Sequence, residues 1–265
     1  MSEVHSPSSN ADPSLSRRRV LQATAAAAVA AALAPPVSAD EDEHVAAVAF
    51  DGFVIFDPRP VYGEAEELFP GRGKEIADLW RTRQFEYAWL RTLTGRYADF
   101  WRVTADALDY ATASAGVEPT PAQRDRLMQG FLQMKAYPDV LPGLKALRTA
   151  GIRLGFLSNL TERMLESAIA SAGLDGLFER LLSTDRVLVY KPDPRAYQMG
   201  VDGFGLPREQ IVFAAFGGWD ANGAKSFGYR TYWANRLKQP VEQLDAKPDA
   251  IGTGVSELVQ FVAGS

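Results

Sequence analysis

The sequence predicts an α/β protein, in which helices cover both faces of a parallel sheet and a further block of helices is inserted after the first strand. Three observations predict this fold. Short apolar runs alternate with stretches of helical length over the second half of the chain, and polar residues follow the runs where parallel strands would end. A purely helical pattern separates the first run from the others. Strands and helices that alternate in this way form parallel sheets covered on both faces.

The first core strand is expected at Val45–Phe50, an apolar run that ends at Asp51. A helical pattern then extends from about Val61 to Met134. In its first part, apolar residues recur at helical spacing and are expected to share one face. These residues are Ile76, Leu79, Trp80, Tyr87, Leu90 and Leu93.

Two more helices complete the inserted block, at Ala98–Ala115 and Pro121–Met134. The second is expected to begin with Thr120 as its N-cap, because Thr and a following Pro are typical of helix starts. A block of helices placed directly after the first strand indicates a cap that is separate from the sheet.

After Tyr137, helices and strands alternate. Helices are expected at Leu141–Ala150, ended by Gly151, at Thr161–Ala172, and from Pro194 onwards with Asp193 as the cap. Strands are expected at Ile152–Leu157, Leu181–Thr184, Ile211–Phe216 and Thr231–Ala234, with Asp220 in the turn after the third. The domains are therefore expected to be an α/β core of residues 40–57 and 138–265 and a helical cap of residues 58–137.

Residues 1–39 are expected to form a disordered leader and signal peptide. A basic group at Arg17–Arg19, an alanine-rich stretch to Ala34 and a small-residue end at Val37–Ala39 follow the order of such peptides. The paired arginines resemble the twin-arginine class, which implies the twin-arginine export machinery as a partner. The apolar stretch is too short to span a bilayer, so we expect a periplasmic or otherwise exported protein without a stable membrane anchor. The alternative is an uncleaved anchor or a wrongly chosen start codon.

Composition excludes several classes of site. The chain has 265 residues, a net charge of -5 and 46% hydrophobic residues, which suits one or two domains and gives no basic footprint for nucleic acid. Because there is no cysteine, disulfides, thiolate metal sites and cysteine nucleophiles are excluded. His5 and His44 are the only histidines and precede the first strand, which argues against a Ser-His-Asp triad or a histidine-bound zinc.

Polar side chains are expected to gather at one edge of the sheet. Asp51, Ser158-Asn159, Lys191 and Asp220 each follow a different predicted strand. Ligands of open parallel sheets bind outside the carboxyl ends of the strands, so these groups should converge there. Any one of them alone is more often a cap or a turn residue. Together they predict a site with two carboxylates, an ammonium, a hydroxyl and an amide.

These residues and several longer motifs resemble the haloacid dehalogenase superfamily, and within it the type II L-2-haloacid dehalogenases. The motifs of the inserted block are Glu67–Gly73, Leu79-Trp80-Arg81, Tyr87–Arg91 and Gly95–Phe100. Those of the core are Asp51, Leu157-Ser158-Asn159, Lys191–Tyr197, Trp219-Asp220 and Trp233–Arg236. The resemblance covers about Val45 to Val262. It implies a Rossmann-like core of the haloacid dehalogenase type with an inserted helical cap, and it makes a homodimer an expectation.

The resemblance implies hydrolysis of a carbon–halogen bond. Asp51 would attack the halogen-bearing carbon of a short 2-haloalkanoic acid, expel halide and form an ester that water then hydrolyses to a 2-hydroxy acid. No cofactor and no metal are implied. A phosphatase of the superfamily would instead have a second carboxylate two residues after the nucleophile, where this chain has Phe53, and more oxygen ligands for magnesium than the turn before Asp220 offers.

The resemblance also implies roles for individual residues. The catalytic set is Asp51, Arg81, Ser158, Lys191, Tyr197 and Asp220, and the substrate-binding set is Phe100, Asn159 and Trp219. Arg81, Asn159 and Phe100 would hold the leaving halide in a dry pocket. Ser158 would hold the substrate carboxylate.

The remaining roles concern the order and charge of the site. Lys191 would neutralise the crowded carboxylates. Tyr197 and Asp220 would order the site, and Asp220 would pair with Lys191. Trp219 would form a wall, with ordinary core packing as the alternative. For Arg81 the alternative is a solvated helix face, because other arginines lie near it on the same predicted helix.

Two loops depart from the family pattern. The loop from Asp51 to Asp57 is one residue shorter than in the family and lacks its threonine. A serine and an asparagine that the family associates with the nucleophile and the hydrolytic water are Ala215 and Gly217. Backbone N–H groups could replace these contacts, which glycine permits sterically. The alternatives to an active dehalogenase are therefore a vestigial acid-binding homologue and another hydrolase of the superfamily, such as a phosphatase.

Overall fold

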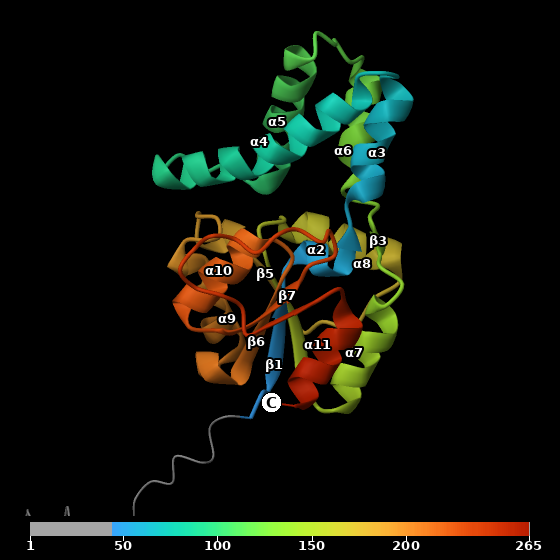
Figure 1. Ribbon diagram of the computed structural model, residues 1–265. Coiled ribbons are helices and arrows are strands. Elements are labelled where there is room, and N and C mark those ends of the chain that lie inside the picture. Colours follow the sequence, from blue (N-terminus) through green and yellow to red (C-terminus); the bar gives the residue numbers. More distant parts are fainter. Residues whose placement is uncertain (1–43, 265) are drawn as a thin grey trace, which may run out of the picture. The chain divides into compact units, whose positions relative to one another are not determined.

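The computed structural model describes residues 44–264, and its centre is a six-stranded parallel sheet in the order β5-β4-β1-β6-β7-β8 (Figure 1). The strands are β1 (Ala47–Phe50), β4 (Arg153–Ser158), β5 (Arg180–Ser183), β6 (Ile211–Ala215), β7 (Arg230–Ala234) and β8 (Ala250–Gly252). β1 pairs in parallel with β4 and with β6, and all four of its residues are buried. The apolar run before Asp51 therefore becomes a central strand, as predicted.

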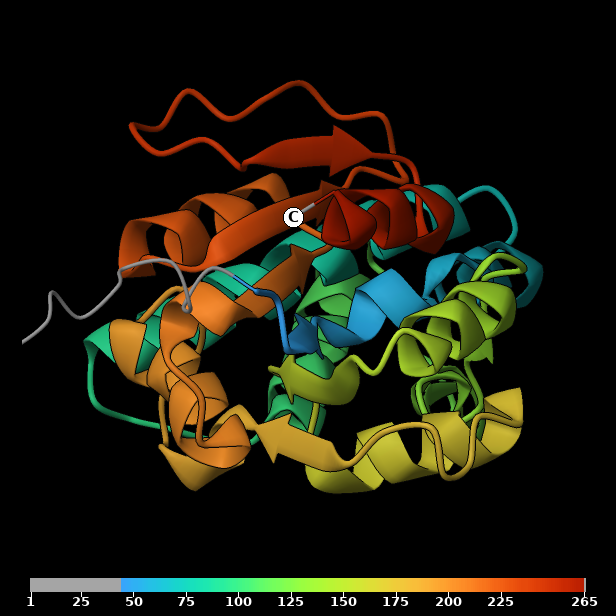
Figure 2. The ribbon, with the colours of Figure 1, turned by 90° about the horizontal axis from the view of Figure 1, so that it is seen from below.

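Helices cover both faces of the sheet, and side chains alternate between the two faces along each strand. Val48 and Phe50 of β1 join one hydrophobic cluster, with α7 (Val140–Thr149), α8 (Glu162–Ala172) and α11 (Val255–Ala263). Ala47 and Ala49 join the other, with α9 (Pro194–Phe204) and α10 (Gly218–Phe227). Figure 2 shows α9 and α10, in orange, on the opposite side of the sheet from the red α11.

The inserted helices form a layer beyond the carboxyl ends of the strands (Figure 1). They are α3 (Arg59–Leu68), α4 (Gly73–Leu93), α5 (Phe100–Ser114) and α6 (Pro121–Gly130). The chain enters this layer through the short α2 (Gly52–Ile55) and β2 (Phe56–Asp57), and it returns through β3 (Lys135–Ala136), which pairs with β2 antiparallel. The predicted α/β fold with an inserted helical cap is confirmed.

The buried face of α4 differs from the predicted stripe. Ile76 and Trp80 are buried as expected, but Leu90 is 53% exposed and Leu93 is 82% exposed. An α-helix turns about 100° per residue, so Leu93 points roughly 140° away from Trp80. Gln84 takes a buried place in the stripe instead, where its amide donates to the Thr104 hydroxyl at 2.8 Å.

Several other boundaries differ. α6 ends at Gly130, short of the predicted Met134, although Thr120 forms the predicted N-cap with a capping box. Asp220 lies in the first turn of α10 and not in the turn before that helix. β8 and α11 were not predicted, although Val255, Leu258 and Val262 of α11 recur at helical spacing and are buried.

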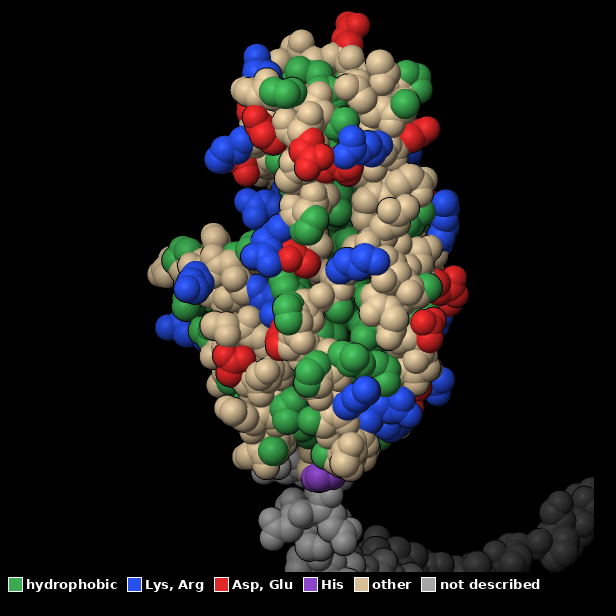
Figure 3. Space-filling view, turned by 90° about the vertical axis from the view of Figure 1, so that its right-hand side faces the viewer, with side chains coloured by type: hydrophobic (Ala, Val, Ile, Leu, Met, Phe, Trp, Pro, Cys, Tyr) green, Lys and Arg blue, Asp and Glu red, His purple; other side chains and the backbone are tan. Residues whose placement is uncertain are grey.

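The predicted leader lies outside the described residues. Within residues 44–264, no helix is both long enough and apolar enough to cross a membrane. Figure 3 shows one face of the molecule, on which acidic and basic side chains are interspersed.

Candidate active site

Asp51 lies at the carboxyl end of the central strand and begins the first turn of α2. Its backbone N–H donates to the Ala214 carbonyl at 2.9 Å, which ties it to β6. Its Oδ1 accepts from the Phe53 N–H at 2.9 Å, so the carboxylate is the N-cap of α2. The side chain remains 11% exposed, and Asp51 lines a cavity.

Lys191 connects Asp51 with Asp220. Its Nζ donates to Asp51 Oδ2 and to Asp220 Oδ2, both at 2.7 Å, and the side chain is fully buried. Burial alone would lower the pKa of Lys191, but the charges of Asp220 and Asp51 outweigh it and raise this pKa. Lys191 is therefore charged at neutral pH, and the predicted pairing of Asp220 with Lys191 is present.

Asp220 is buried beneath the cavity and is held from a second side. The Tyr197 hydroxyl donates to its Oδ1 at 2.7 Å. Burial raises the pKa of Asp220 to about 6, although the charge of Lys191 opposes the rise. Burial also raises the pKa of Tyr197 well above its ordinary value, so this phenol keeps its proton and stays a donor.

Ser158 and Asn159 hold the neighbouring loops in place. Ser158 Oγ accepts from the N–H of Gly52 at 3.3 Å and from that of Leu160 at 3.1 Å. A Cβ on Gly52 would lie 2.6 Å from Leu160 Cδ1 and 3.0 Å from Ser158 Oγ, so a larger residue here would have to displace these side chains. Asn159 Oδ1 accepts from the Lys191 N–H at 3.2 Å. These bonds join the ends of β1 and β4 to the loop that carries Lys191.

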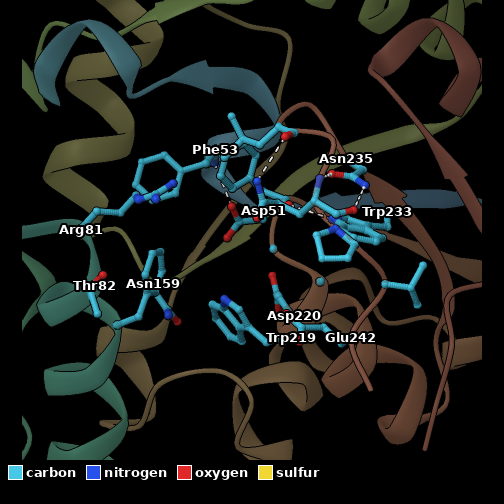
Figure 4. A pocket seen from close by; sticks show the side chains of 18 of the residues that line it. Asp51, Phe53, Arg81, Thr82, Asn159, Trp219, Asp220, Trp233, Asn235 and Glu242 are labelled. Carbon is cyan, nitrogen blue, oxygen red and sulfur yellow. Dashed lines mark hydrogen bonds between the residues drawn. The ribbon is translucent and has the colours of Figure 1, made fainter. Parts of the chain in front are cut away.

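A cavity of about 550 Å³ lies over Asp51, between the carboxyl ends of the strands and α4 (Figure 4). Arg81, Thr82 and Phe85 of α4 line one side of it. No carboxylate within residues 44–264 lies at ion-pair distance from Arg81. Arg81 is exposed and lines the cavity, so its guanidinium, without a counterion in this part of the chain, can meet an anion there.

Aromatic rings form much of the remaining wall. Trp219 lies 5.5 Å from the ring of Phe85 and 5.2 Å from that of Trp89, measured between ring centroids. Phe53 and Phe216 also line the cavity and contact each other at 5.8 Å. Apolar walls exclude water and strengthen the electrostatic interactions between the charged groups near them.

Phe100 is the one predicted site residue that the structure does not bring to the cavity or to the Lys191 network. It is fully buried as the first residue of α5 and packs on the Tyr190 ring at 6.0 Å. Tyr197 is also fully buried, and it reaches the site through Asp220.

Sequence reasoning missed one wall of the cavity. Leu237 and residues 239–243, in the segment after β7, line the side away from α4, together with Trp233 and Asn235. Trp233–Arg236 is one of the motifs that carry the family resemblance, but the sequence predicts no site role for it. The loop beyond it has no periodic pattern that could place it over the cavity.

The shortened loop after Asp51 forms the turn α2, and the Phe53 N–H supplies a donor to the carboxylate. This N–H is a backbone contact of the kind that would replace the missing threonine hydroxyl. Residues 44–264 contain no cluster of three or more His, Asp or Glu side chains that could hold a metal ion.

Comparisons with known proteins agree with this geometry. A family model described as haloacid dehalogenase-like hydrolase matches residues 17–228. The haloacetate dehalogenase H-2 of Moraxella sp. (strain B) is 38% identical over 220 residues, which are 83% of this chain and 98% of that protein. The (S)-2-haloacid dehalogenase of Pseudomonas sp. (strain YL) is 37% identical over 83% of this chain and 95% of its own length.

Solved structures give the same result. A crystal structure of an L-2-haloacid dehalogenase is 43% identical, with a TM-score of 0.81 over 83% of this chain and 99% of that one. The L-2-haloacid dehalogenase of Xanthobacter autotrophicus with chloropropionic acid covalently bound is 32% identical, with a TM-score of 0.78, over 83% of this chain and 99% of that one. The chain belongs to the haloacid dehalogenase-like hydrolases, and within them it is homologous to the L-2-haloacid dehalogenases.

Proposed function

We propose that this protein hydrolyses short 2-haloalkanoic acids to 2-hydroxy acids through an ester on Asp51, without a metal ion. One observation carries the proposal. The Asp51 carboxylate is fixed by Lys191 and by the Phe53 N–H, and it faces an apolar cavity whose other side presents the Arg81 guanidinium. The names of the similar proteins, which include (S)-2-haloacid dehalogenases, support the same reaction.

In the first step, an Asp51 oxygen attacks the halogen-bearing carbon from the side opposite the halogen. A carbon–oxygen bond forms, the carbon–halogen bond breaks, and halide leaves with the bonding electron pair. Halide needs no proton to leave, so Phe53 in place of an acid does not hinder this step. The guanidinium of Arg81 and the amide of Asn159 would stabilise the developing negative charge.

In the second step, water attacks the carbonyl carbon of the Asp51 ester. The bond between that carbon and the substrate oxygen breaks, and the 2-hydroxy acid leaves with an oxygen that came from Asp51. One proton of the water goes to the departing oxygen and the other to solvent, so the Asp51 carboxylate is restored. Configuration at the reacting carbon is inverted once, in the first step.

The remaining predicted roles are part of the proposal. Ser158 Oγ accepts two backbone N–H groups, and its own O–H is left to donate to the substrate carboxylate. Lys191 neutralises the two carboxylates, while Tyr197 and Asp220 hold it in place. Trp219 forms an apolar wall. A halide contact from Phe100 would require it to move toward the cavity.

The test is halide release from (S)-2-chloropropionate in a chelator-treated buffer. We expect steady release by the wild type and by Asp175→Asn, a surface variant with the same change of charge. Asp51→Asn should be inactive while circular dichroism shows it folded. Folded wild-type protein that releases halide only at the background rate would overturn the proposal, and magnesium-dependent release of phosphate from an ester would point to the phosphatase alternative.

Mass spectrometry separates the two steps. Ala215 and Gly217 stand where the family has polar side chains, which favours a slow second step and keeps the vestigial alternative open. Incubation with the haloacid should add the mass of the acid, less its halogen, to the peptide that contains Asp51. An adduct that accumulates without turnover would place the defect in hydrolysis of the ester.

Export is the second part of the proposal. Arg17 and Arg18, the alanine-rich stretch and the end at Ala39 support a twin-arginine signal peptide and a periplasmic location. We expect the exported chain to begin near Asp40 in N-terminal sequencing. Replacing Arg17 and Arg18 by lysine should keep the full-length chain in the cytoplasm, and unchanged export would count against this part.

The domain boundaries also remain proposals. We place the core at residues 40–57 and 138–265 and the cap at 58–137. The β2 and β3 pair, through which the chain enters and leaves the inserted helices, supports these limits. Limited proteolysis that cuts first near residues 57 and 137 would support them, whereas first cuts inside α4 or α5 would contradict them.

A further inference from the structure

The cavity over Asp51 is larger than a short 2-haloacid needs. Its volume is about 550 Å³, within the range of roughly 300–1,000 Å³ that is usual for pockets that hold drug-sized ligands. The halogen-bearing carbon must lie at Asp51 for the proposed reaction. Much of the cavity is therefore left for the rest of the substrate.

The wall away from α4 is a fixed loop. The side chain of Asn235 accepts from the Gln239 N–H and donates to the Gln239 carbonyl, both at 2.8 Å. Next to it, Arg236 pairs with Asp139 at 3.0 Å. These contacts hold the base of the loop, so Leu237 and residues 239–243 present a built surface to the cavity.

Glu242 is the charged residue of this wall. A Cβ on Gly218 would lie 2.8 Å from Glu242 Cγ and 3.2 Å from its Oε1, so the glycine leaves the space that this side chain occupies. The amides of Gln239 and Gln243 donate to carbonyls of their own loop. By contrast, the Glu242 carboxylate accepts no hydrogen bond and meets no cation within residues 44–264.

The charged residues around the cavity are of two kinds, paired and unpaired. Asp51 and Asp220 share the Lys191 ammonium, whereas Arg81 and Glu242 line the cavity without such a partner. Glu242 is exposed and lies next to Gly218 at the start of α10, whereas Arg81 belongs to α4, and Figure 4 shows the two side chains apart. A substrate anion is attracted to Arg81, and a second anion at the far end of the substrate would be repelled by Glu242.

We propose that Glu242 determines specificity, and that the preferred substrates are 2-haloacids of medium length with a hydrogen-bond donor, best an ammonium group, at the end remote from the halogen. This rests on the proposed dehalogenation and extends its substrates from short 2-haloacids to longer ones that carry a remote donor. The reacting end lies at Asp51, the apolar chain follows the aromatic wall, and the donor reaches the Glu242 carboxylate.

The test compares kcat/KM for halide release from three acids of equal chain length, 6-amino-2-chlorohexanoate, 2-chlorohexanoate and 2-chloroadipate. We expect the ammonium acid to be preferred over the neutral acid, and the neutral acid over the dicarboxylate, by roughly fivefold at each step, as for a partly exposed ion pair. Equal values for the three acids, or a preference for the dicarboxylate, would overturn the assignment.

Two variants test whether Glu242 causes the preference among the three acids. Glu242→Gln should reduce the differences among the three acids to about twofold or less, because the amide removes the charge. Asp245→Asn, which removes a charge from the same loop outside the cavity wall, should keep the wild-type order. A Glu242→Gln protein that keeps the full preference would overturn the role of Glu242.

2-Chloropropionate, assayed in parallel, distinguishes failure of the proposed specificity from failure of the proposed dehalogenation. Halide release from it without any preference among the longer acids overturns only the substrate class. Release from none of the four acids overturns the proposed dehalogenation itself.

Discussion

Among single residues, Lys191 matters most for the electrostatics of the site, because its ammonium neutralises both Asp51 and Asp220. It is fully buried and donates to two carboxylates that are themselves buried. Removing one partner of such a group leaves uncompensated charge in a medium of low polarity, which is costly. The residue is therefore expected to matter for stability as well as for catalysis.

The first prediction is that Lys191→Met lowers the free energy of unfolding at pH 8 by about 3–5 kcal/mol. The loss should shrink as the pH falls to 5. The pKa of Asp220 is already raised to about 6 in the wild type, so the folded variant takes up a proton that the unfolded chain does not, and lower pH favours the fold. Urea unfolding at both pH values measures the effect.

A double variant provides the control. Asp220→Asn removes one of the two carboxylates that Lys191 neutralises, so Lys191→Met combined with Asp220→Asn should be more stable at pH 8 than Lys191→Met alone. Additive losses from the two substitutions would mean that the three groups do not act as one network.

The second prediction concerns the pH dependence of activity. Below about pH 6, Asp220 becomes protonated and stops competing for the Lys191 ammonium. Lys191 then draws charge from Asp51 alone, which makes this oxygen a weaker nucleophile, so kcat/KM should fall as the pH drops through about 6. A profile of kcat/KM from pH 4.5 to 8 measures the pKa of the titrating group in the free enzyme.

Asp220→Asn is the matched variant for this profile. It should be less active than the wild type but should lack the decline near pH 6, because the amide does not titrate. If the variant keeps the same decline, another group is responsible.

Helices and strands are the scale at which the sequence was most informative. Periodicity placed the strands that end at Asp51 and Ser158, because central parallel strands are continuously apolar. It also placed the capped starts of α6 and α9 at Thr120 and Asp193. Because all three residues follow predicted parallel strands, Asp51, Lys191 and Asp220 could be predicted to lie close together without any knowledge of contacts.

Periodicity failed where packing or loops decide. Leu90 and Leu93 fit a helical apolar pattern, yet they are exposed because the buried stripe of α4 follows Ile76, Trp80, Gln84 and Ala88. Glu242 could not be predicted as a site residue, since a loop that follows β7 can take many directions. Phe100 was assigned by resemblance alone, and its contacts lie elsewhere.

The third prediction belongs to the packing of α3 on α4. A Cβ on Gly73 would lie 2.1 Å from the Glu66 Cα and 2.2 Å from its N, so Gly73→Ala must push the two helices apart. We expect a loss of about 1–3 kcal/mol in the free energy of unfolding, as for other overpacked sites. Thermal and urea unfolding measure the loss.

Gly63 in the same pair of helices is the matched control. A Cβ there would meet nothing within 4 Å, so Gly63→Ala should be neutral or should stabilise the protein by up to about 1 kcal/mol. Equal behaviour of the two alanine variants would show that backbone contact is not what selects glycine at position 73.

The whole molecule presents an apolar surface on the inserted helices. Leu90 is 53% exposed and Leu93 is 82% exposed on α4, and Tyr110 on α5 is 42% exposed. Leu90 and Leu93 are three residues apart and are therefore neighbours on the helix surface, and exposed apolar neighbours of this kind are typical of interfaces between subunits. They support the expectation of a homodimer that the family resemblance raised.

The fourth prediction is that the protein is a homodimer in solution and that α4 lies in its interface. A lysine at position 93 would place a charge against the partner subunit, where it would lose its hydration without gaining a counterion. Leu93→Lys should therefore be monomeric at micromolar concentration, whereas Leu141→Lys, at a 39% exposed position on α7, should remain dimeric. Light scattering after size-exclusion chromatography measures both masses, and a wild type that is monomeric throughout, or a Leu93→Lys protein that stays dimeric, would contradict the interface. Because α4 also carries Arg81 over the cavity, a change in kcat/KM that follows the change in mass would show that the dimer holds this helix in place.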